Sequence, residues 1–595
     1  MYLRTVKAKG ADGVEFEYIR LVEAYWEDGH SKQRVVANLG RKDVLAPHLE
    51  SLIELLGGGK KTKANSLSRG EHIEATVAAC WGPMLVARSL WREFGLESIL
   101  DSLAPKTKTV QKVARLALAD RVLVLVANRL CRPGSEHALA QWLESDFVCG
   151  RDGKRILARW KQQGRVRVDL GWLQEWYRTL DQLLAHKDGI ELELFGRLRD
   201  LFHLQAEMVF YDLTSTYFEG AGPAGLADFG YSRDGKPRNR QVQVGLVMIN
   251  GWPIAHHVFD GSLPDSETVE SVLKDLQQRF GLRRVILVGD RGMVTIENLA
   301  LLRQRGQGYL VGLRRRRNAQ VNRYIEAAAQ GRWQECPVGI TAREKEKPPR
   351  TMVTEVAGKE PGVRVFVVQS EERLAYERAM REAAMEKTRQ ALDKLAVRVA
   401  AGRLKKAQNI GAAAARILNR NHGSRYYDWS LEQGIFRYFE HPVHLPAEKA
   451  LEGKYVIQTE ELDLSATQAV EAYKDLSEVE RSFRELKDLI EMRPIYHQRP
   501  KRVRAHIFVA ALAFLLDRAL EKKLKAAGVP MSSAQAMEAL RTMHVVDIRV
   551  GAEIRRGVTA GNHQARQILA ALGISDREPI QTDSIVRENA RLVTN

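Results

Sequence analysis

Alternation of apolar and polar positions predicts a β-rich start to the chain. Strand-like runs cover residues 16–25 and 34–39, on either side of an Asp-Gly turn. A stretch rich in Gly and Lys, residues 57–63, then predicts a linker. We therefore expect a β-rich N-terminal region over residues 1–60.

The pattern becomes helical between residues 70 and 205. Apolar positions recur near the helical period in four segments, which are residues 75–94, 110–130, 137–143 and 170–185. Several of these segments carry Arg and Lys, which suits a domain that binds DNA ends, although a solvated helical face explains the same charges. We expect residues 70–205 to form a helical domain, with DNA-end binding as its candidate role.

Residues 206–315 predict an α/β unit with the element order β-β-β-α-β-α-β. Its hairpin is indicated by two apolar runs, 241–249 and 252–259, which flank an Asn-Gly pair. The other expected elements are strands at 208–213, 284–290 and 308–313 and helices at 265–280 and 295–305. The later strands are apolar throughout, as expected for strands covered on both faces.

A long interruption separates this unit from the next helices. Residues 316–465 contain strand-like runs and one long charged helix, expected over 371–403. Helices then resume at 466–491 and 501–526. We predict an inserted domain at 316–465, a second part of the α/β core at 466–530, and a helical C-terminal region at 531–595.

The composition narrows the class of protein. Lys and Arg number 92 against 74 Asp and Glu, a net charge of +18, which suits either a polyanion partner or a basic protein with no nucleic acid. No run reaches the roughly 18 apolar residues of a membrane helix, and the first residues lack a signal peptide's apolar stretch. The four cysteines form no CxxC pair. We expect a cytoplasmic protein with no membrane partner.

Two aspartates end or interrupt apolar strands. Asp212 lies within a strand-like run, where a carboxylate is costly to bury unless it is paired or binds a metal. It could instead cap the turn that follows through Thr214 or Ser215. Asp290 ends the run 285–290, at the edge where sites gather in open α/β sheets. A helix N-cap is the alternative there.

Helical geometry selects one glutamate from an acid-rich segment. Seven residues make nearly two turns, so Tyr473, Glu480 and Lys487 form one stripe. The apolar residues Leu476 and Phe483 flank this stripe, which predicts a partly buried face. A second acidic stripe, which includes Glu478 and Glu485, is rotated by about 160° and predicts a solvated face. We expect Glu480 to point toward the core, with a salt bridge to Arg484 as its alternative role.

Three carboxylates from two strands and one helix suit a two-metal site. Such sites hold divalent ions about 4 Å apart, one activating the nucleophile and the other stabilising the leaving oxygen. Carboxylates favour Mg²⁺, with Mn²⁺ as a substitute, because these are hard, octahedral cations. The predicted catalytic and metal-binding residues are therefore Asp212, Asp290 and Glu480, with two ions.

Several blocks of the chain resemble one protein family. Residues 473–487 carry Tyr473, Glu480 and Lys487 at the spacing of the Tyr-x2-Arg-x3-Glu-x6-Lys signature, although Leu476 occupies the arginine position. The blocks at 211–220, 230–242, 289–299, 493–497 and 505–508, and the N-terminal Val35–Arg41 segment, are similar to others of the family. In this order and spacing, they resemble bacterial insertion-sequence DDE transposases of the Tyr-Arg-Glu-Lys branch, which act by cut and paste.

This resemblance implies a fold, a reaction and partners. It implies an RNase H-like core, a mixed sheet flanked by helices, with a mainly β insertion before the helix of the glutamate. The enzyme would bind terminal inverted repeats of double-stranded DNA, cleave them and transfer strands to target DNA, as a dimer or higher oligomer on paired ends. It would act in the bacterial cytoplasm on nucleoid DNA. The DNA-contact candidates are Tyr473, Lys487, Arg291 and Arg484, with Arg484 or Arg481 in place of the signature arginine.

Two other functions stay open from the sequence. An RNase H-like nuclease that hydrolyses DNA without strand transfer would share the three carboxylates. A transposase-derived DNA-binding protein that has lost catalysis is the second alternative. All three acids are present, which favours an active enzyme over the second alternative.

Overall fold

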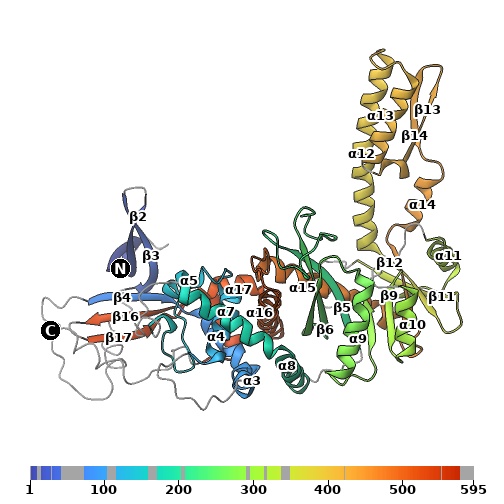
Figure 1. Cartoon of the computed structure of the whole chain (residues 1–595). Helices are drawn as coiled ribbons and strands as arrows, with labels where there is room; N and C mark the ends of the chain where they lie inside the picture. Colours follow the sequence, from blue (N-terminus) through green and yellow to red (C-terminus); the bar gives the residue numbers. More distant parts are fainter. Residues whose placement is uncertain are drawn as a thin grey trace.

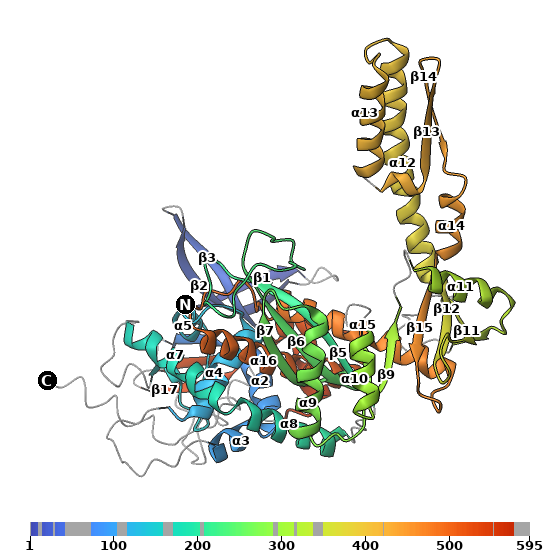
Figure 2. The same cartoon turned by 45° about the vertical axis from the view of Figure 1, so that its right-hand side comes forward.

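The computed structural model contains a nine-stranded mixed sheet, whose strands come from residues 208–459 (Figures 1 and 2). Its strand order is β10-β11-β12-β15-β9-β8-β5-β6-β7. The structure describes residues 2–9, 15–27, 30–41, 73–103, 116–158, 170–202, 208–289, 295–313, 318–336, 349–420, 422–550 and 553–575.

Five strands of this sheet come from the predicted α/β unit. They are β5 (Met208–Tyr217), β6 (Gln241–Ile249), β7 (Trp252–Asp260), β8 (Ile286–Gly289) and β9 (Gly308–Gly312). β5, β6 and β7 pair antiparallel, whereas β8 runs parallel to both β5 and β9. With α9 (Val269–Gln278) and α10 (Ile296–Gln304) between strands, the element order β-β-β-α-β-α-β is confirmed.

Local sequence explains two of these features. Asn250 and Gly251 both have positive φ, 50° and 72°, as the tight turn between β6 and β7 requires. β6, β8 and β9 are buried along their whole length; β8 and β9 have apolar sequences, whereas β6 also buries Gln241 and Gln243. Asp265 accepts a hydrogen bond from Arg233 at 2.6 Å, and a 3-10 turn over Asp265–Thr268 precedes α9.

The segment between β9 and α15 (Ala466–Arg484) both extends the sheet and builds an arm. Four of its strands continue the sheet, namely β10 (Gln334–Glu335), β11 (Thr351–Ala357), β12 (Arg364–Ser370) and β15 (Lys454–Thr459). Beside them lies the short helix α11 (Ala319–Ala327). These strands therefore belong to the central sheet and do not form a separate one.

The arm stands away from the rest of the molecule in both views (Figures 1 and 2). It consists of α12 (Glu371–Ala400), α13 (Ala407–Arg420), the hairpin β13 (Tyr427–Glu432) and β14 (Ile435–Glu440), and α14 (His444–Leu451). It has its own apolar cluster, which includes Leu392, Leu395 and Leu418. The prediction of a mainly β insertion is therefore wrong, because the Ala-, Glu- and Arg-rich α12 alone covers 30 residues.

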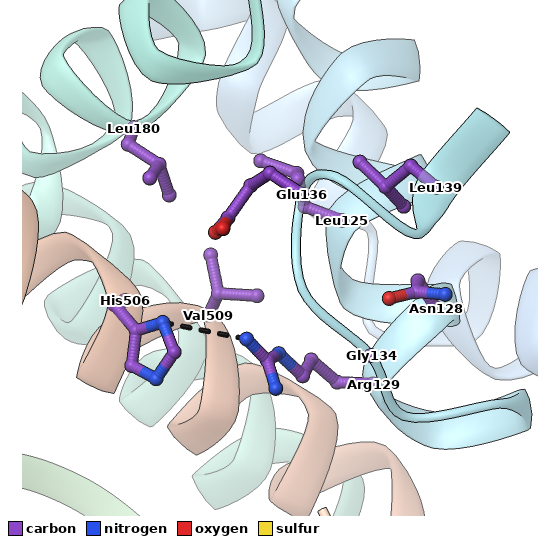
Figure 3. Close-up of a pocket in the computed structure, with 9 residues that line it drawn as sticks. All are labelled: Leu125, Asn128, Arg129, Gly134, Glu136, Leu139, Leu180, His506 and Val509. Carbon is purple, nitrogen blue, oxygen red and sulfur yellow. Dashed lines mark hydrogen bonds between the residues drawn. The ribbon is translucent and has the colours of Figure 1, made fainter. Parts of the chain in front are cut away.

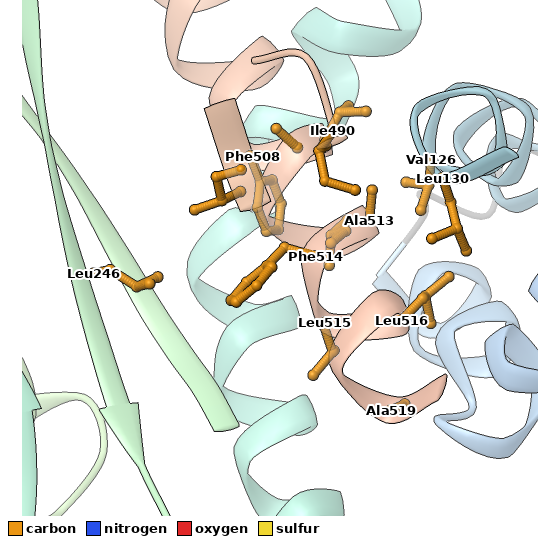
Figure 4. Close-up of a cluster of buried hydrophobic side chains, with 14 of the residues drawn as sticks. Val126, Leu130, Leu246, Ile490, Phe508, Ala513, Phe514, Leu515, Leu516 and Ala519 are labelled. Carbon is orange, nitrogen blue, oxygen red and sulfur yellow. The ribbon is translucent and has the colours of Figure 1, made fainter. Parts of the chain in front are cut away.

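The helices before β5 share one core with α16 (Pro500–Ala526). α2 (Gly82–Glu93), α4 (Leu118–Cys131) and α7 (Leu170–Ala185) pack against α16, which also packs against β7. In Figure 4, Leu516 of α16 faces α4, whereas Phe514 lies on the side of Leu246 in β6. The other helices of this region are α3 (Leu96–Leu103), α5 (Leu139–Ser145) and α8 (Lys187–Phe202).

Long-range strand pairing corrects two of the sequence predictions. Residues 73–80, largely expected to be helical, form β4 (Ile73–Cys80), which pairs with β16 (His544–Val550). β16 also pairs with β17 (Glu553–Val558), so the C-terminal region is not wholly helical, although it contains α17 (Ser533–Leu540) and α18 (His563–Ala571). Residues so far apart in sequence meet only in the folded chain, so no local pattern revealed the pairing.

The N-terminal region contains a second small sheet. β1 (Tyr2–Lys9), β2 (Glu15–Glu27) and β3 (His30–Arg41) pair antiparallel in that order. None of the helices within the described ranges has the length and apolar character needed to cross a membrane.

The apolar cluster of the arm is separate from the core that α16 shares with the sheet and the helices before β5, which we call the body. This separation leads to a first prediction. Leu516→Ala removes a fully buried side chain from the body and should lower its free energy of unfolding by about 2–5 kcal/mol. Leu395→Ala is the matched change in the arm cluster, where the side chain is 2% exposed. Hydrogen exchange should increase in α4 and α16 for the first variant and in α12 and α13 for the second. Equal exchange changes in both parts for both variants would contradict two separate cores.

Candidate active site

Asp212 lies near the middle of β5 and is half-buried. Its neighbour Tyr211 projects to the opposite face, where its hydroxyl donates a hydrogen bond to Thr268 Oγ1 at 2.9 Å. That face is the one on which α9 begins. One carboxylate oxygen of Asp212 accepts a hydrogen bond from the backbone N–H of Leu213. Asp212 therefore projects from the other face of the sheet.

α15 covers the face from which Asp212 projects. Phe210, two residues before Asp212, pairs with Met248 of β6, and cross-strand partners share a face. The hydroxyl of Ser482, in α15, donates to Met248 Sδ at 3.4 Å. α15 also packs against β8 and β9. The helix that carries Glu480 is thus seated on the same side of the sheet as Asp212.

The sequence around α15 explains where it begins and which face it buries. Ser465 and Gln468 form a reciprocal capping box at its N-terminus. Leu476, Val479 and Phe483 are at most 5% exposed and dock the helix on the sheet. Such docking is where most of the stability of a helix in a protein comes from.

The burial of the acids in α15 differs from the prediction. Glu480 is exposed and lies at the edge of the buried face, next to Val479. Glu485, expected on a solvated face, has a side chain only 16% exposed and accepts a hydrogen bond from Arg481 at 2.7 Å. The expectation that Glu480 points into the core is therefore wrong. The reason is α16, which contacts the opposite side of the helix through Arg518, near Glu478 and Glu485.

Asp290 and Arg291 lie outside the described residues. β8 ends at Gly289, the residue that precedes Asp290. The parallel pairing of β5 and β8 is recorded up to Phe210 opposite Val288. Asp212 and Asp290 are each two positions further along the chain from that pair.

Lys487 is held in a buried ion pair. Its ammonium group lies 2.8 Å from Asp234 Oδ1, and the two side chains are 8% and 2% exposed. Arg493 contacts the same carboxylate oxygen at 2.5 Å. Burial lowers the pKa of Lys487, and Asp234 offsets that effect in part. The predicted DNA contact at Lys487 would therefore require this pair to open, a constraint that the sequence did not reveal.

The path of the backbone explains the position of Lys487. α15 passes directly into a π-helical turn over Glu485–Leu489, in which the spacing of side chains differs from that of an α-helix. The seven-residue stripe therefore does not continue unchanged from Glu480 to Lys487. Asp234, in the basic block 230–242, was not singled out in the sequence, although it is the acid that joins this block to Lys487.

The other candidates for DNA contact have different surroundings. Tyr473 is half-buried and stacks on Tyr455, with ring centroids 5.7 Å apart, and its hydroxyl lies close to Gly312. Leu476, at the signature arginine position, is buried. Of the two replacements considered, Arg481 is paired with Glu485 and Glu521, whereas Arg484 is exposed. Arg484 is the more accessible of the two.

A second carboxylate cluster lies between α15 and α16. Asp517 is 1% exposed, with Arg518, Glu521, Glu485 and Ser533 around it. Burial, reinforced by the neighbouring Glu521 and Glu485, raises the pKa of Asp517 to about 7. Asp517 therefore holds a proton in the folded chain over a pH range in which an ordinary aspartate is ionised.

Three side chains elsewhere meet the distance condition for a metal site. Glu136, His497 and His506 are buried and offer ligand atoms within 4.8 Å of one another. In the pocket of Figure 3, the Glu136 carboxylate points toward His506 and Arg129. The hydrogen bond from His497 and the charges of His506 and Arg129 overcome the effect of burial and hold the pKa of Glu136 below its usual range.

The partners of His506 argue against a cation at this cluster. Its Nε2 lies 3.0 Å from the Met492 carbonyl and its Nδ1 lies 3.3 Å from an Arg129 guanidinium nitrogen. Both ring nitrogens are therefore engaged, and a buried guanidinium would repel a cation. Arg129 also donates to the Glu491 carbonyl. The cluster is better suited to joining α4, α16 and the segment after α15.

Two family models match the chain. A model described as the transposase DDE domain matches residues 205–516, just over half of the chain, and this range encloses Asp212, Asp290 and Glu480. A model of the N-terminal domain of IS1634 family transposases matches residues 3–65. No curated protein matches the chain.

The buried pair between Lys487 and Asp234 leads to a stability prediction. Asp234→Ala leaves the buried Lys487 without its carboxylate partner and should lower the free energy of unfolding by about 3–5 kcal/mol. Asp488 contacts Arg493, as Asp234 does, but is 63% exposed, so Asp488→Ala should cost less than about 1 kcal/mol. Urea denaturation measures both. A similar loss in the two variants would contradict the buried pair.

The raised pKa of Asp517 predicts a pH dependence. Below pH 4 the carboxyl is protonated in the folded and unfolded chain, and the native state has its full stability. Between pH 4 and 7 the unfolded chain loses this proton first, so rising pH should lower the free energy of unfolding by about 4 kcal/mol. Asp517→Asn should remove this component. The test is urea denaturation at pH 4.5, 6 and 7.5, and an unchanged pH profile in the variant would contradict it.

Proposed function

Because the chain belongs to the DDE transposases of insertion sequences, we propose that it cleaves and joins DNA with Asp212, Asp290 and Glu480 as its catalytic carboxylates. The observation that carries this proposal is the position of α15. This helix lies on the face of the sheet from which Asp212 projects, and it presents Glu480 at its exposed edge. A carboxylate that acts on a DNA phosphate must be accessible from solvent, as the exposed Glu480 is.

We infer that β7-β6-β5-β8-β9, with α9, α10 and α15, is the RNase H-like core. The antiparallel β5, β6 and β7, the two parallel strands that follow and the flanking helices support this assignment. Phe210 and Val288 are the last recorded partners of the parallel strands β5 and β8, and Asp212 and Asp290 each follow them by two positions in the sequence. This equal spacing is our basis for grouping the two aspartates.

The three carboxylates fit divalent cations by their donor chemistry. They offer only oxygen ligands, which suit Mg²⁺ or Mn²⁺. When bound, two such ions would activate water or a DNA 3′-hydroxyl and stabilise the leaving oxygen. The half-buried Asp212 would anchor the site from β5, and Glu480 would close it from the side of α15. We assign the ions to these residues because both ring nitrogens of His506 in the buried histidine cluster are already engaged.

The substrate we propose is double-stranded DNA at the element's terminal inverted repeats, followed by target DNA. Arg484 is exposed at the end of α15 and is our leading candidate for a phosphate contact near the cut. Tyr473 and Arg291 are further candidates, and Lys487 joins them only if its pair with Asp234 opens. Membership of the Tyr-Arg-Glu-Lys branch, the cut-and-paste pathway, action on the bacterial nucleoid and a dimer or higher oligomer on paired ends are parts of the same proposal.

A cleavage assay tests the three carboxylates. The purified full chain is incubated with a duplex that carries the element end, with Mg²⁺, Mn²⁺ or EDTA. Asp290→Asn should reduce cleavage by at least about 100-fold while leaving DNA binding unchanged. Changing even a residue that only supports a metal ligand typically lowers activity by about 10–100-fold, and loss of a ligand should cost more. Asp212→Asn and Glu480→Gln should behave alike, and EDTA should abolish cleavage.

The control for this assay lies on the same helix. Glu471 is exposed in the first turns of α15, and Glu471→Gln should retain wild-type cleavage. If it loses as much activity as Glu480→Gln, the assignment of Glu480 is wrong. Hydrolysis without joining of the cleaved ends to a target plasmid would favour a nuclease. DNA binding without cleavage in any divalent metal would favour a non-catalytic DNA-binding protein.

A further inference from the structure

The far end of the arm carries positive charge that no acid neutralises. We define the arm tip as the C-terminal end of α12, the connection 401–406 and α13. From residue 394 to 427 the chain contains eight Lys and Arg and no Asp or Glu. Seven of the eight side chains are exposed, namely Lys394, Arg398, Arg403, Lys405, Lys406, Arg416 and Arg420. The arm tip is therefore a basic surface.

The lower part of α12 differs in its charge pairing. Arg373 contacts Glu377 at 2.9 Å, and Arg389 contacts Glu386 at 2.8 Å. Arg381 contacts Glu452 of the segment after α14 at 2.6 Å. For the seven cations of the arm tip, the described part of the chain records no ion pair. Charge balance along α12 thus ends where the arm tip begins.

The last acid before this stretch is already engaged. Asp393 contacts Arg389 at 3.1 Å and accepts a hydrogen bond from the Tyr438 hydroxyl of the neighbouring hairpin. The acids of that hairpin lie on its own strands, as with Asp428 in β13 and Glu440 in β14. The basic surface is accordingly confined to the end of α12, the connection 401–406 and α13.

The cations of the arm tip repel one another and so lower the stability of the arm. Lys394 with Arg398, and Arg416 with Arg420, are like-charge pairs at a spacing of four residues, which destabilises a helix. Lys405 and Lys406 immediately precede α13, at the positive end of its dipole. The arm's stability comes from its apolar cluster and not from these cations. A bound polyanion would compensate their repulsion.

We propose that the arm tip binds the phosphate backbone of duplex DNA, at a distance from the catalytic carboxylates. This inference rests on the proposed function for its choice of DNA over other polyanions. α12 leaves the sheet directly after β12, and its 30 residues span about 45 Å. This length exceeds one turn of B-DNA, about 34 Å. The arm tip therefore contacts DNA more than one turn from the cut, or contacts a second duplex.

The composition of α13 fits a backbone contact. Its exposed face contains Ala412, Arg416 and Arg420, and the small Ala412 lets a phosphate chain approach closely. Phosphate contacts supply affinity and register without reading sequence. The arm tip would thus bind duplex DNA of any base sequence.

The test compares two triple variants of the full chain that lose the same charge. Arg403→Gln, Lys405→Gln and Lys406→Gln alter the arm tip. Arg373→Gln, Arg378→Gln and Lys387→Gln alter exposed residues in the lower part of α12. Dissociation constants for a long duplex carrying the element end are measured from 50 to 200 mM salt. Hydrogen exchange of the Leu395 peptide confirms that the arm stays folded in each variant.

The arm-tip variant should bind at least about tenfold more weakly, and its slope of log affinity against log salt should fall by about 2–3. The lower-arm variant should change neither value by as much. Hydroxyl-radical protection should disappear more than one turn from the cut in the arm-tip variant alone. Equal losses of duplex affinity in the two variants would overturn the inference. It would also be overturned if the arm-tip variant lost affinity for single-stranded RNA but kept its affinity for the duplex.

The same measurements separate this inference from the proposed function. If the wild type cleaves the duplex and the arm-tip variant binds like the lower-arm variant, the inference fails and the proposed function stands. If the wild type binds through the arm tip but cleaves nothing in any divalent metal, the proposed function fails and the inference stands.

Discussion

The packing of α15 against β5 and β8 is the constraint on which the candidate site depends. Leu476, Val479 and Phe483 bury the inner face of this helix, and the hydrophobic gain of about 1.5–3 kcal/mol for each large side chain holds it there. The helix is separated from β5 by the entire insertion, so no local interaction joins the two. Its docking alone brings Glu480 to the face from which Asp212 projects.

The same docking accounts for the charged network around the site. α16 lies beside α15 and also packs against the sheet through β7, so Glu478 and Glu485 of α15 meet Arg518 and are drawn partly out of solvent. Where the helix changes to a π turn, Lys487 enters the interior and meets Asp234. A buried pair of this kind fixes the loop 230–240, which precedes β6, to the end of the helix. Lys487 is therefore part of the framework that joins this loop to the end of α15.

The insertion has been built on the sheet rather than beside it. Its strands β10, β11, β12 and β15 continue the strand order beyond β9, and α12 leaves directly from β12. β12 is hydrogen-bonded to a strand on each side, so the first residues of α12 continue from a strand inside the sheet. The arm, with its separate apolar cluster, is therefore a projection anchored to the central sheet at the end of β12.

The sequence by itself determined the elements whose signals are local. The Asn-Gly hairpin, α7, α12 and α16 were predictable because turn chemistry and helical periodicity depend on residues a few positions apart. The order of the family's blocks likewise identified the kind of enzyme. Only the tertiary structure decided the pairing of β4 with β16, the exposure of Glu480 and the burial of Lys487 on Asp234. Each of these depends on contacts between residues far apart in the sequence. The pattern of α15 alone does not determine on which side of it α16 packs, and that packing decides which of its acids are exposed.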